Sequence, residues 1–266
     1  PTAMPPSARA LASARAWRWR CCSPSMRAAS WSLTSIPPPA KAAFCACFSA
    51  GDTLVAVVAD GMGGHNAGEV ASAAAVDKIS EYLKENLETE PVRDCLLHAV
   101  EAANGFVYKK ARSDRRYTAM GTTAVLCCVR DGCAYIANVG DSRAYLVGED
   151  IVQVTEDHSV VEELLRRGEI TKNEALTHPH RNMITRALGT EPRVLPDLFR
   201  CELSPGDILL LCSDGLSGLL EDVEIQAVLS GGGSLQERLE QLVEAANERG
   251  GYDNITAVAV QMSEVQ

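Results

Sequence analysis

Four aspartates occupy the same kind of place in this sequence, because each follows an apolar run or a tight turn and stands beside glycine, serine or asparagine. They are Asp60, Asp141, Asp214 and Asp253. One such aspartate is ordinary turn chemistry, but the strand ends of a packed sheet can converge on one cleft, where unpaired carboxylates would repel one another. A hard divalent cation removes that repulsion, and Mg²⁺ and Mn²⁺ prefer oxygen ligands. The pattern therefore predicts a magnesium or manganese site.

The chemistry that such a site would support is phosphate ester hydrolysis. Two ions close together can hold a bridging water, lower its pKa and clamp the oxygens of a phosphate. No side-chain nucleophile fits as well: residues 140–144 lack the final glycine of a Gly-x-Ser-x-Gly elbow, and Cys21 and Arg27 have no glycine-rich loop between them. A Walker A motif and zinc-type His or Cys spacing are also missing.

The elements that must position these aspartates follow from hydrophobic periodicity. The β-branched run at 53–59 predicts a buried strand that ends at Asp60. Asp131-Gly132 predicts a hairpin between two further strands. Runs of antiparallel strands with paired long helices predict an α+β layered sandwich rather than a βαβ order. The expected helices cover 66–87, 91–110, 222–230 and 235–248, and the expected strands cover 122–129, 133–138, 142–147, 198–203, 207–212 and 254–260.

Composition excludes several functional classes. The 266 residues carry a formal net charge of −10, which disfavours nucleic acid as a partner because phosphate backbones need clustered Lys and Arg. No apolar run approaches the roughly 20 residues that span a bilayer, so no membrane partner is expected. The ten cysteines form no Cys-x-x-Cys, and several lie inside apolar runs. They therefore indicate reduced, buried thiols and a cytoplasmic protein.

The first 51 residues differ from the rest. They hold six Lys or Arg and no Asp or Glu, and they are rich in Ala, Ser, Pro and Arg. We interpret residues 1–51 as an atypical basic segment, either poorly ordered or read in the wrong frame, with a transit peptide as a further reading. The catalytic domain is then expected to cover 52–266, where the net charge is −16.

From residue 52 onward the sequence resembles a known family. Residues 60–72 (Asp-Gly-Met-Gly-Gly-His-x-x-Gly-Glu-x-Ala-Ser) are similar to the signature of bacterial metal-dependent protein Ser/Thr phosphatases, the PPM or PP2C family. Further motifs follow in that family's order, at residues 120–123, 139–143, 155–159, 185–189, 212–216 and 253–256. The resemblance covers about residues 52–262. It implies a four-layer αββα sandwich of two antiparallel sheets and a mobile flap over 158–190.

The resemblance also implies roles for individual residues. Asp60 would bridge two Mn²⁺ or Mg²⁺ ions and the Gly61 carbonyl would bind one of them, while Asp214 and Asp253 would complete the ligands of the second. Asp141, with Asp214, would hold a third and weaker ion. Asp60 and Asp253 would serve catalysis through the metal-held water. The implied substrates are proteins phosphorylated on serine or threonine by an opposing bacterial kinase, and the implied oligomeric state is a monomer.

One departure from the family pattern affects this expectation. The family begins with a strand that carries a phosphate-binding Arg followed by Asn-Glu-Asp, and residues 1–51 contain no acidic residue. The phosphate-binding residue is therefore unknown, and we expect weakened binding of the first ion and low activity. Two alternatives stay open: a catalytically impaired regulatory module that binds a partner, and a phosphohydrolase for small molecules.

Overall fold

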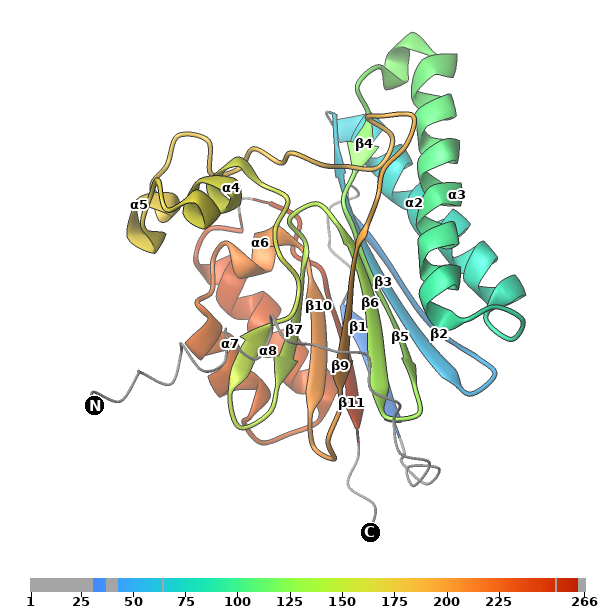
Figure 1. The fold of residues 1–266 in the computed structure, drawn as a ribbon. Helices are drawn as coiled ribbons and strands as arrows, with labels where there is room; N and C mark the ends of the chain where they lie inside the picture. The colour runs from blue at the N-terminus through green and yellow to red at the C-terminus, as the bar shows by residue number, and fades with distance from the viewer. Residues whose placement is uncertain (1–30, 37–42, 64, 252, 263–266) are drawn as a thin grey trace.

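The protein forms two antiparallel sheets that pack face to face (Figure 1). Its structure is a computed structural model that describes residues 31–36, 43–63, 65–251 and 253–262. One sheet has the strand order β1-β11-β10-β7-β8, and the other has the order β2-β3-β5-β6-β9, with the short β4 paired to β3. The first sheet consists of β1 (Trp31–Ile36), β11 (Ala257–Met262), β10 (Ile208–Cys212), β7 (Arg143–Val147) and β8 (Ile151–Gln153). The second consists of β2 (Ala43–Ala50), β3 (Thr53–Met62), β5 (Ala124–Arg130), β6 (Cys133–Val139) and β9 (Asp197–Glu202), and β4 is Gly121–Thr122.

Helices cover the outer face of each sheet, which confirms the expected four-layer αββα sandwich. On the second sheet lie α2 (His65–Asn86) and α3 (Val92–Ser113), followed by the 3₁₀ turn η1 (Arg115–Tyr117). On the first lie α6 (Asp214–Ser217), α7 (Asp222–Leu229) and α8 (Leu235–Glu248). Two further helices, α4 (Val160–Arg167) and α5 (Lys172–Leu176), stand apart from the sandwich at one end (Figure 1). They occupy the segment for which the sequence predicts a flap.

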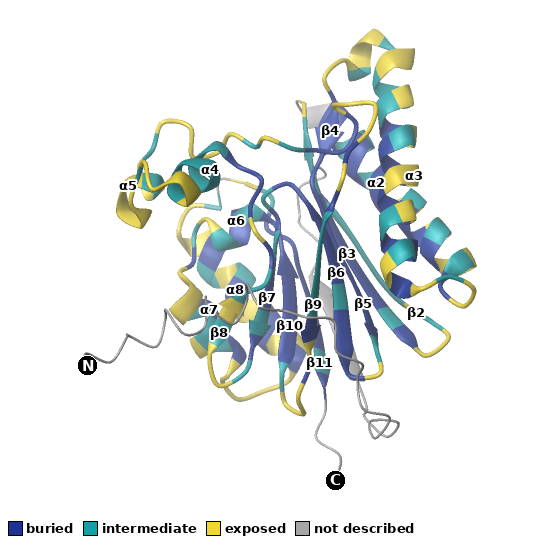
Figure 2. Cartoon of the chain, viewed as in Figure 1, coloured by how far each residue is buried: buried dark blue, intermediate teal, exposed yellow. Residues whose placement is uncertain are grey.

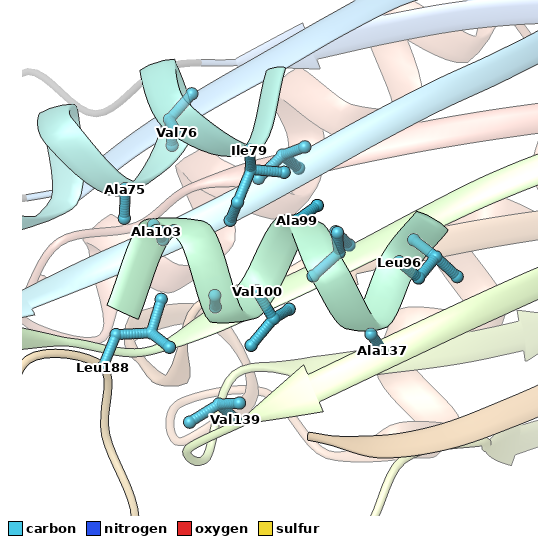
Figure 3. Packing of buried hydrophobic residues seen from close by; sticks show 14 of the residues in the cluster. Ala75, Val76, Ile79, Leu96, Ala99, Val100, Ala103, Ala137, Val139 and Leu188 are labelled. Atoms are coloured by element: carbon cyan, nitrogen blue, oxygen red, sulfur yellow. The ribbon is translucent and has the colours of Figure 1, made fainter. Parts of the chain in front are cut away.

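The buried side chains form three apolar layers, and Figure 2 shows the buried residues along the central strands of both sheets. Strand β3 shows why: Val55, Val57 and Ala59 pack against α2 and α3, whereas Ala56 and Val58 pack between the sheets. Figure 3 shows the helix-side layer, where side chains of α2 and α3 meet those of the second sheet. Because side chains alternate along a strand, the side chain of Asp60 belongs to the face between the two sheets, at the end of the sandwich.

Most of the predicted elements are present within a few residues of their expected bounds. The Asp131-Gly132 hairpin is confirmed, and both residues have the positive φ (51° and 73°) that a two-residue turn of this kind requires. Strand β3 continues beyond its expected end, because Gly61 and Met62 pair with β4. Strand β8 and the short helix α6 were not predicted.

The expected domain boundary at residue 52 is too late. Strands β1 and β2 lie within the first 51 residues, and each pairs with a strand of the sandwich. Strand β2 also alternates, with Phe44 and Phe48 toward the helices and Cys45 and Cys47 between the sheets. Its Ala- and Cys-rich composition conceals this pattern, because neither residue type separates an apolar from a polar face. Residues 1–30 and 37–42, including Cys21 and Arg27, lie outside the described residues.

Within the described ranges, no helix is both long and apolar enough to cross a bilayer. Of the six buried cysteines among the described residues, five are free thiols, as the sequence predicts: Cys95, Cys127, Cys128, Cys201 and Cys212. The sixth, Cys133, is disulfide-bonded, so the expectation of a reduced thiol is wrong there. Burial raises the pKa of the Cys127, Cys201 and Cys212 thiols to about 12. These thiols are therefore core residues without nucleophilic character at neutral pH.

Candidate metal centre

The four predicted aspartates lie together at one end of the sandwich. Asp60 stands near the end of β3, Asp141 follows β6, Asp214 begins α6 directly after β10, and Asp253 precedes β11. Burial, followed by the charges of Asp214, Asp253 and Asp141, raises the pKa of Asp60 to about 9. The structure thus brings together carboxylates that are up to 193 residues apart in the chain.

Two of the other carboxylates are perturbed in the same direction. Burial and the charges of Asp214 and Asp157 raise the pKa of Asp141 to about 7. Burial and the charge of Asp253 raise the pKa of Asp214 to about 6. Desolvation and like charges both disfavour the ionised form. The cluster therefore stores electrostatic repulsion, which a cation would relieve.

The donor set fits a hard divalent cation. The buried Oδ2 atom of Asp60 has no hydrogen-bond partner among the described residues. A buried carboxylate oxygen without a hydrogen bond, in a cluster of acidic residues, is available to coordinate a cation. Within the same part of the chain, no three acidic, His or Cys side chains are placed to hold one ion by themselves. Water or backbone oxygen would therefore have to complete the coordination, as Mg²⁺ and Mn²⁺ readily allow.

The backbone of Asp60 is fixed by two threonines, Thr122 at the end of β4 and Thr123 directly before β5. Its N–H donates to Thr123 Oγ1 at 3.0 Å, and its carbonyl oxygen accepts from Thr122 Oγ1 and from the Thr123 N–H, each at 2.8 Å. Thr123 Oγ1 also bonds Ser142 Oγ at 2.8 Å, which joins the Asp60 loop to the Asp141 loop. No local sequence pattern indicates this role of the two threonines.

Close backbone packing on the helix side explains one glycine of the signature motif, Gly68. A Cβ atom on Gly68 would lie 2.7 Å from the carbonyl oxygen of Gly61. Because real Cβ atoms do not approach backbone that closely, helix α2 can sit against Gly61 only with glycine at 68. The carbonyl group that the resemblance implies as a ligand is thus held in place by α2.

Ser213 ties the loops of Asp214 and Asp253 together. Its Oγ donates to the Asn254 carbonyl at 2.6 Å and accepts from the Thr256 N–H at 3.0 Å. Asn254 in turn donates its backbone N–H and its side-chain amide to Asp253 Oδ1, at 2.8 and 3.2 Å. Asn254 therefore orients the carboxylate of Asp253.

Arg143 is a cation near this cluster, and its charge offsets a small part of the burial and like charges that raise the pKa values of Asp141 and Asp214. Its guanidinium is held by Asp157 at 2.7–3.0 Å and by the Tyr145 hydroxyl at 2.9 Å. These partners engage three of the five guanidinium N–H groups and fix the orientation of Arg143, so we assign it a structural role. Among the residues that the structure describes, we therefore assign none to the phosphate-binding role.

His158 links the Asp141 loop to the flap. Its Nδ1 accepts the Gly140 N–H at 3.0 Å, and its Nε2 lies 3.2 Å from Asp197 Oδ2. Asp197 accepts from Arg186, at the far end of the flap segment, at 2.7 Å. Gly140 itself must be glycine, because it has a φ of 109° and an added Cβ would lie 2.6 Å from Thr123.

We expect His158→Ala to weaken Mn²⁺ binding and turnover roughly 10-fold, since a lost hydrogen bond of this kind is worth about 1 kcal/mol or more. His158→Asn, whose amide oxygen can replace Nδ1 as an acceptor, should retain most of the function.

Burial lowers the pKa of His158, so the wild type should lose stability as pH falls below about 6.5. His158→Asn should not show that loss. Mn²⁺ titrations and thermal melts between pH 5 and 8 give both readouts, and equal Mn²⁺ affinity in all three proteins would contradict the role.

Comparisons with known proteins agree with this arrangement. The profile of the family described as Protein phosphatase 2C matches residues 41–259. The serine/threonine phosphatase Stp of Listeria innocua is 42% identical over 216 residues, which cover 80% of this chain and 86% of that protein. The structure of the S. agalactiae serine/threonine phosphatase superposes with a TM-score of 0.82 at 34% identity, covering 89% of this chain and 100% of that one. The catalytic domain of the serine/threonine phosphatase PstP, solved in complex with 2 manganese ions, gives a TM-score of 0.76 at 29% identity, with 89% and 99% covered.

Proposed function

The chain belongs to the protein phosphatase 2C family, and from this we propose that it hydrolyses phosphoserine and phosphothreonine in proteins at a centre of two Mn²⁺ or Mg²⁺ ions. The observation that carries the proposal is the convergence of Asp60, Asp141, Asp214 and Asp253 around a buried carboxylate oxygen that has no described partner. The manganese ions of the PstP structure support the choice of cofactor. The relatives named as Ser/Thr phosphatases support the choice of substrate.

The residues of the chain would divide the task among them. When bound, the two ions would supply an activated water and would stabilise the charge that develops on the phosphate oxygens. The charges of the other three aspartates contribute to the raised pKa of Asp60, and Asp60 would be a ligand of both ions. The Gly61 carbonyl would be a ligand of one of them. Asp214 and Asp253 would hold the second ion, and Asp141 with Asp214 a third. The hydroxyls of Thr123, Ser142 and Ser213 hold the segments that carry these aspartates in fixed relative positions.

A second candidate function is a regulatory module of low activity. It is favoured by strand β2, which lies directly beside β3 and contains no acidic residue from Ala43 to Ala50. Ala43 is the residue paired with Asp60. A centre without a carboxylate on this strand would bind its first ion more weakly, and single charge-stabilising groups are worth about 10²–10³ in rate.

One assay separates the candidates. Purified protein is incubated with a phosphothreonine peptide and with p-nitrophenyl phosphate, each with and without Mn²⁺. Metal-dependent release from the peptide supports the proposal, and turnover of the small ester alone points to a small-molecule phosphohydrolase. Release from neither substrate by a folded protein points to the regulatory module.

A chelator gives a prediction that does not depend on turnover. We expect excess EDTA to remove the activity and to lower the melting temperature, because a cation that binds only the folded state stabilises it by an amount that grows with the logarithm of the cation concentration above Kd. With Mn²⁺ at 100 times its Kd the stabilisation is about 2.7 kcal/mol. Differential scanning fluorimetry with a Mn²⁺ series measures it, with Na⁺ at matched ionic strength as the control. A melting temperature that does not change across the Mn²⁺ series would contradict the proposed metal centre.

The cellular setting forms part of the same proposal. Serine/threonine-phosphorylated proteins would be the substrates, with a bacterial Ser/Thr kinase acting in the opposite direction. The five free buried thiols support a reducing, cytoplasmic location. We propose a monomer, which size-exclusion chromatography with light scattering would test.

A further inference from the structure

The C-terminal end of α3 carries a concentration of positive charge on an acidic protein. Five of the eight residues from 109 to 116 are Lys or Arg, whereas residues 52–266 as a whole have a net charge of −16. Lys109, Arg112, Arg115 and Arg116 are exposed, and Figure 2 shows this end of α3 among the solvent-facing parts of the chain. We call residues 109–116 the basic segment.

Most of this charge is not used within the protein. Arg116 is bound to Asp114 at 2.6 Å. In the part of the chain that the structure describes, Lys109, Lys110, Arg112 and Arg115 form no ion pair with a carboxylate. Two of the four lie over aromatic rings: Arg112 is 4.4 Å from the ring centre of Tyr108, and Lys110 is 5.8 Å from that of Phe106.

Helix stabilisation does not explain so many charges. Lys110 and Arg112 lie in the last turn of α3, where cations interact favourably with the helix dipole. That effect falls off within one turn, yet Arg115 belongs to η1, beyond the end of α3. A surplus of exposed cations beside an exposed aromatic ring, here that of Phe106, is typical of a surface that binds an anionic partner.

The position of the basic segment connects it to the active site. Residues 117–120 lead from it directly into β4, which pairs with Gly61 and Met62. An added Cβ on Gly63 would lie 2.8 Å from the Ala119 carbonyl, so this connection packs against the Asp60 loop. On the other side, Asn104 of α3 accepts from the Gly189 N–H and donates to the Glu191 carbonyl, which fixes the end of the flap segment beside α3.

We propose that the basic segment is a docking surface for acidic stretches of the phosphoprotein substrates, next to the phosphorylated residue. This inference rests on the proposed function. A peptide bound in the cleft could reach the segment, because an extended chain advances about 3.3 Å per residue and the segment joins β4 through only four residues. The acidic surface of the rest of the protein would repel such a stretch elsewhere, so the basic segment would also set its direction of binding.

A pair of matched double variants tests the docking surface. Arg112→Gln/Arg115→Gln removes two charges from the basic segment, and Lys84→Gln/Arg93→Gln removes two exposed charges from the other end of the α2–α3 pair. The first readout is fluorescence anisotropy of a labelled Asp/Glu-rich peptide without phosphate, which needs no turnover. We expect the first variant to bind roughly 5-fold more weakly, from about 0.5 kcal/mol for each exposed ion pair, and the second to bind as the wild type does. Binding of the wild type should weaken steeply with salt.

The second readout is kcat/KM in Mn²⁺ on phosphothreonine peptides with acidic or neutral flanks and on p-nitrophenyl phosphate. The first variant should raise KM for the acidic peptide alone and leave kcat and the small ester unchanged. Equal peptide affinity in the wild type and both variants, equal losses in both variants, or tighter binding of a single-stranded oligonucleotide than of the acidic peptide would each overturn the inference. Absence of turnover on every substrate, with the anisotropy result intact, would count against the proposed function and not against docking.

Discussion

Replacing Asp60 with Asn is expected to have opposite effects on activity and on stability. The variant should lose about 10³ in kcat/KM on a phosphothreonine peptide, at the upper end of the range for a single charge-stabilising group. Asn keeps the size of the side chain but removes the charge that a bridging ligand needs. The same change removes the carboxyl group whose ionised form is most strongly disfavoured by burial and by three neighbouring carboxylates. The metal-free variant should therefore be more stable than the metal-free wild type.

The gain in stability should depend on pH in a defined direction. The pKa of Asp60 is raised from 3.8 to about 9 in the folded state, so the folded protein keeps a proton that the unfolded chain releases. The contribution of Asp60 to stability is therefore present below pH 3.8 and is lost as pH rises through about 9. In EDTA, the melting temperatures of wild type and Asp60→Asn should coincide near pH 4 and diverge as pH rises. A difference of about 2 kcal/mol corresponds to roughly 4–8 °C.

Asp77→Asn provides the matched control, because Asp77 is exposed on α2 and its replacement removes the same charge at a distance from the cluster. It should leave both the activity and the pH profile unchanged. Mn²⁺ should raise the melting temperature of the wild type and of the control, and much less that of Asp60→Asn. A metal-free Asp60→Asn that is less stable than the wild type at pH 8 would show that the cluster does not store the repulsion assigned to it.

The four aspartates of the cluster could be identified from the sequence, but the hydroxyl residues that hold their loops could not. The difference has a physical origin. Asp60 and Asp214 follow continuous apolar strands, so local periodicity alone places them at strand ends. The supports depend on pairs that are distant in sequence: Thr123 meets Ser142 only because β5 and β6 are neighbours, and Ser213 reaches Asn254 only because β10 and β11 are neighbours. No local pattern reports such contacts, although a hydroxyl residue directly before or after a candidate ligand is a signal worth following.

Strand β2 illustrates a second limit. Its alternation is visible once the strand is paired with β3, but Ala and Cys are poor indicators of which face is buried. The paired register is informative in itself, because it places Ala43 opposite Asp60. Phe44 faces the helices and Cys45 faces the other sheet, so Ala43 shares the face of Asp60 between the sheets.

Ala43→Asp is accordingly expected to add a carboxylate to the metal centre. Directly opposed residues of an antiparallel pair have Cβ atoms about 4.5–5.5 Å apart, a separation that one cation can bridge. Ala43 is buried, so the new charge should destabilise the metal-free protein by about 2 kcal/mol or more. Saturating Mn²⁺ should recover that loss, and the concentration of Mn²⁺ that gives half-maximal activity should fall about 10-fold, which corresponds to about 1.4 kcal/mol.

Ser49→Asp is the control for Ala43→Asp, since it adds the same charge to the exposed far end of β2, opposite Leu54. Thermal melts across a Mn²⁺ series report on both variants even if neither turns over substrate. A larger Mn²⁺-dependent rise in melting temperature for Ala43→Asp than for the wild type or Ser49→Asp would show that the centre lacks a ligand on β2 and accepts one there. If Mn²⁺ raises the melting temperature of all three proteins equally, the missing carboxylate does not limit metal binding, and any low activity must arise from the unassigned phosphate-binding group.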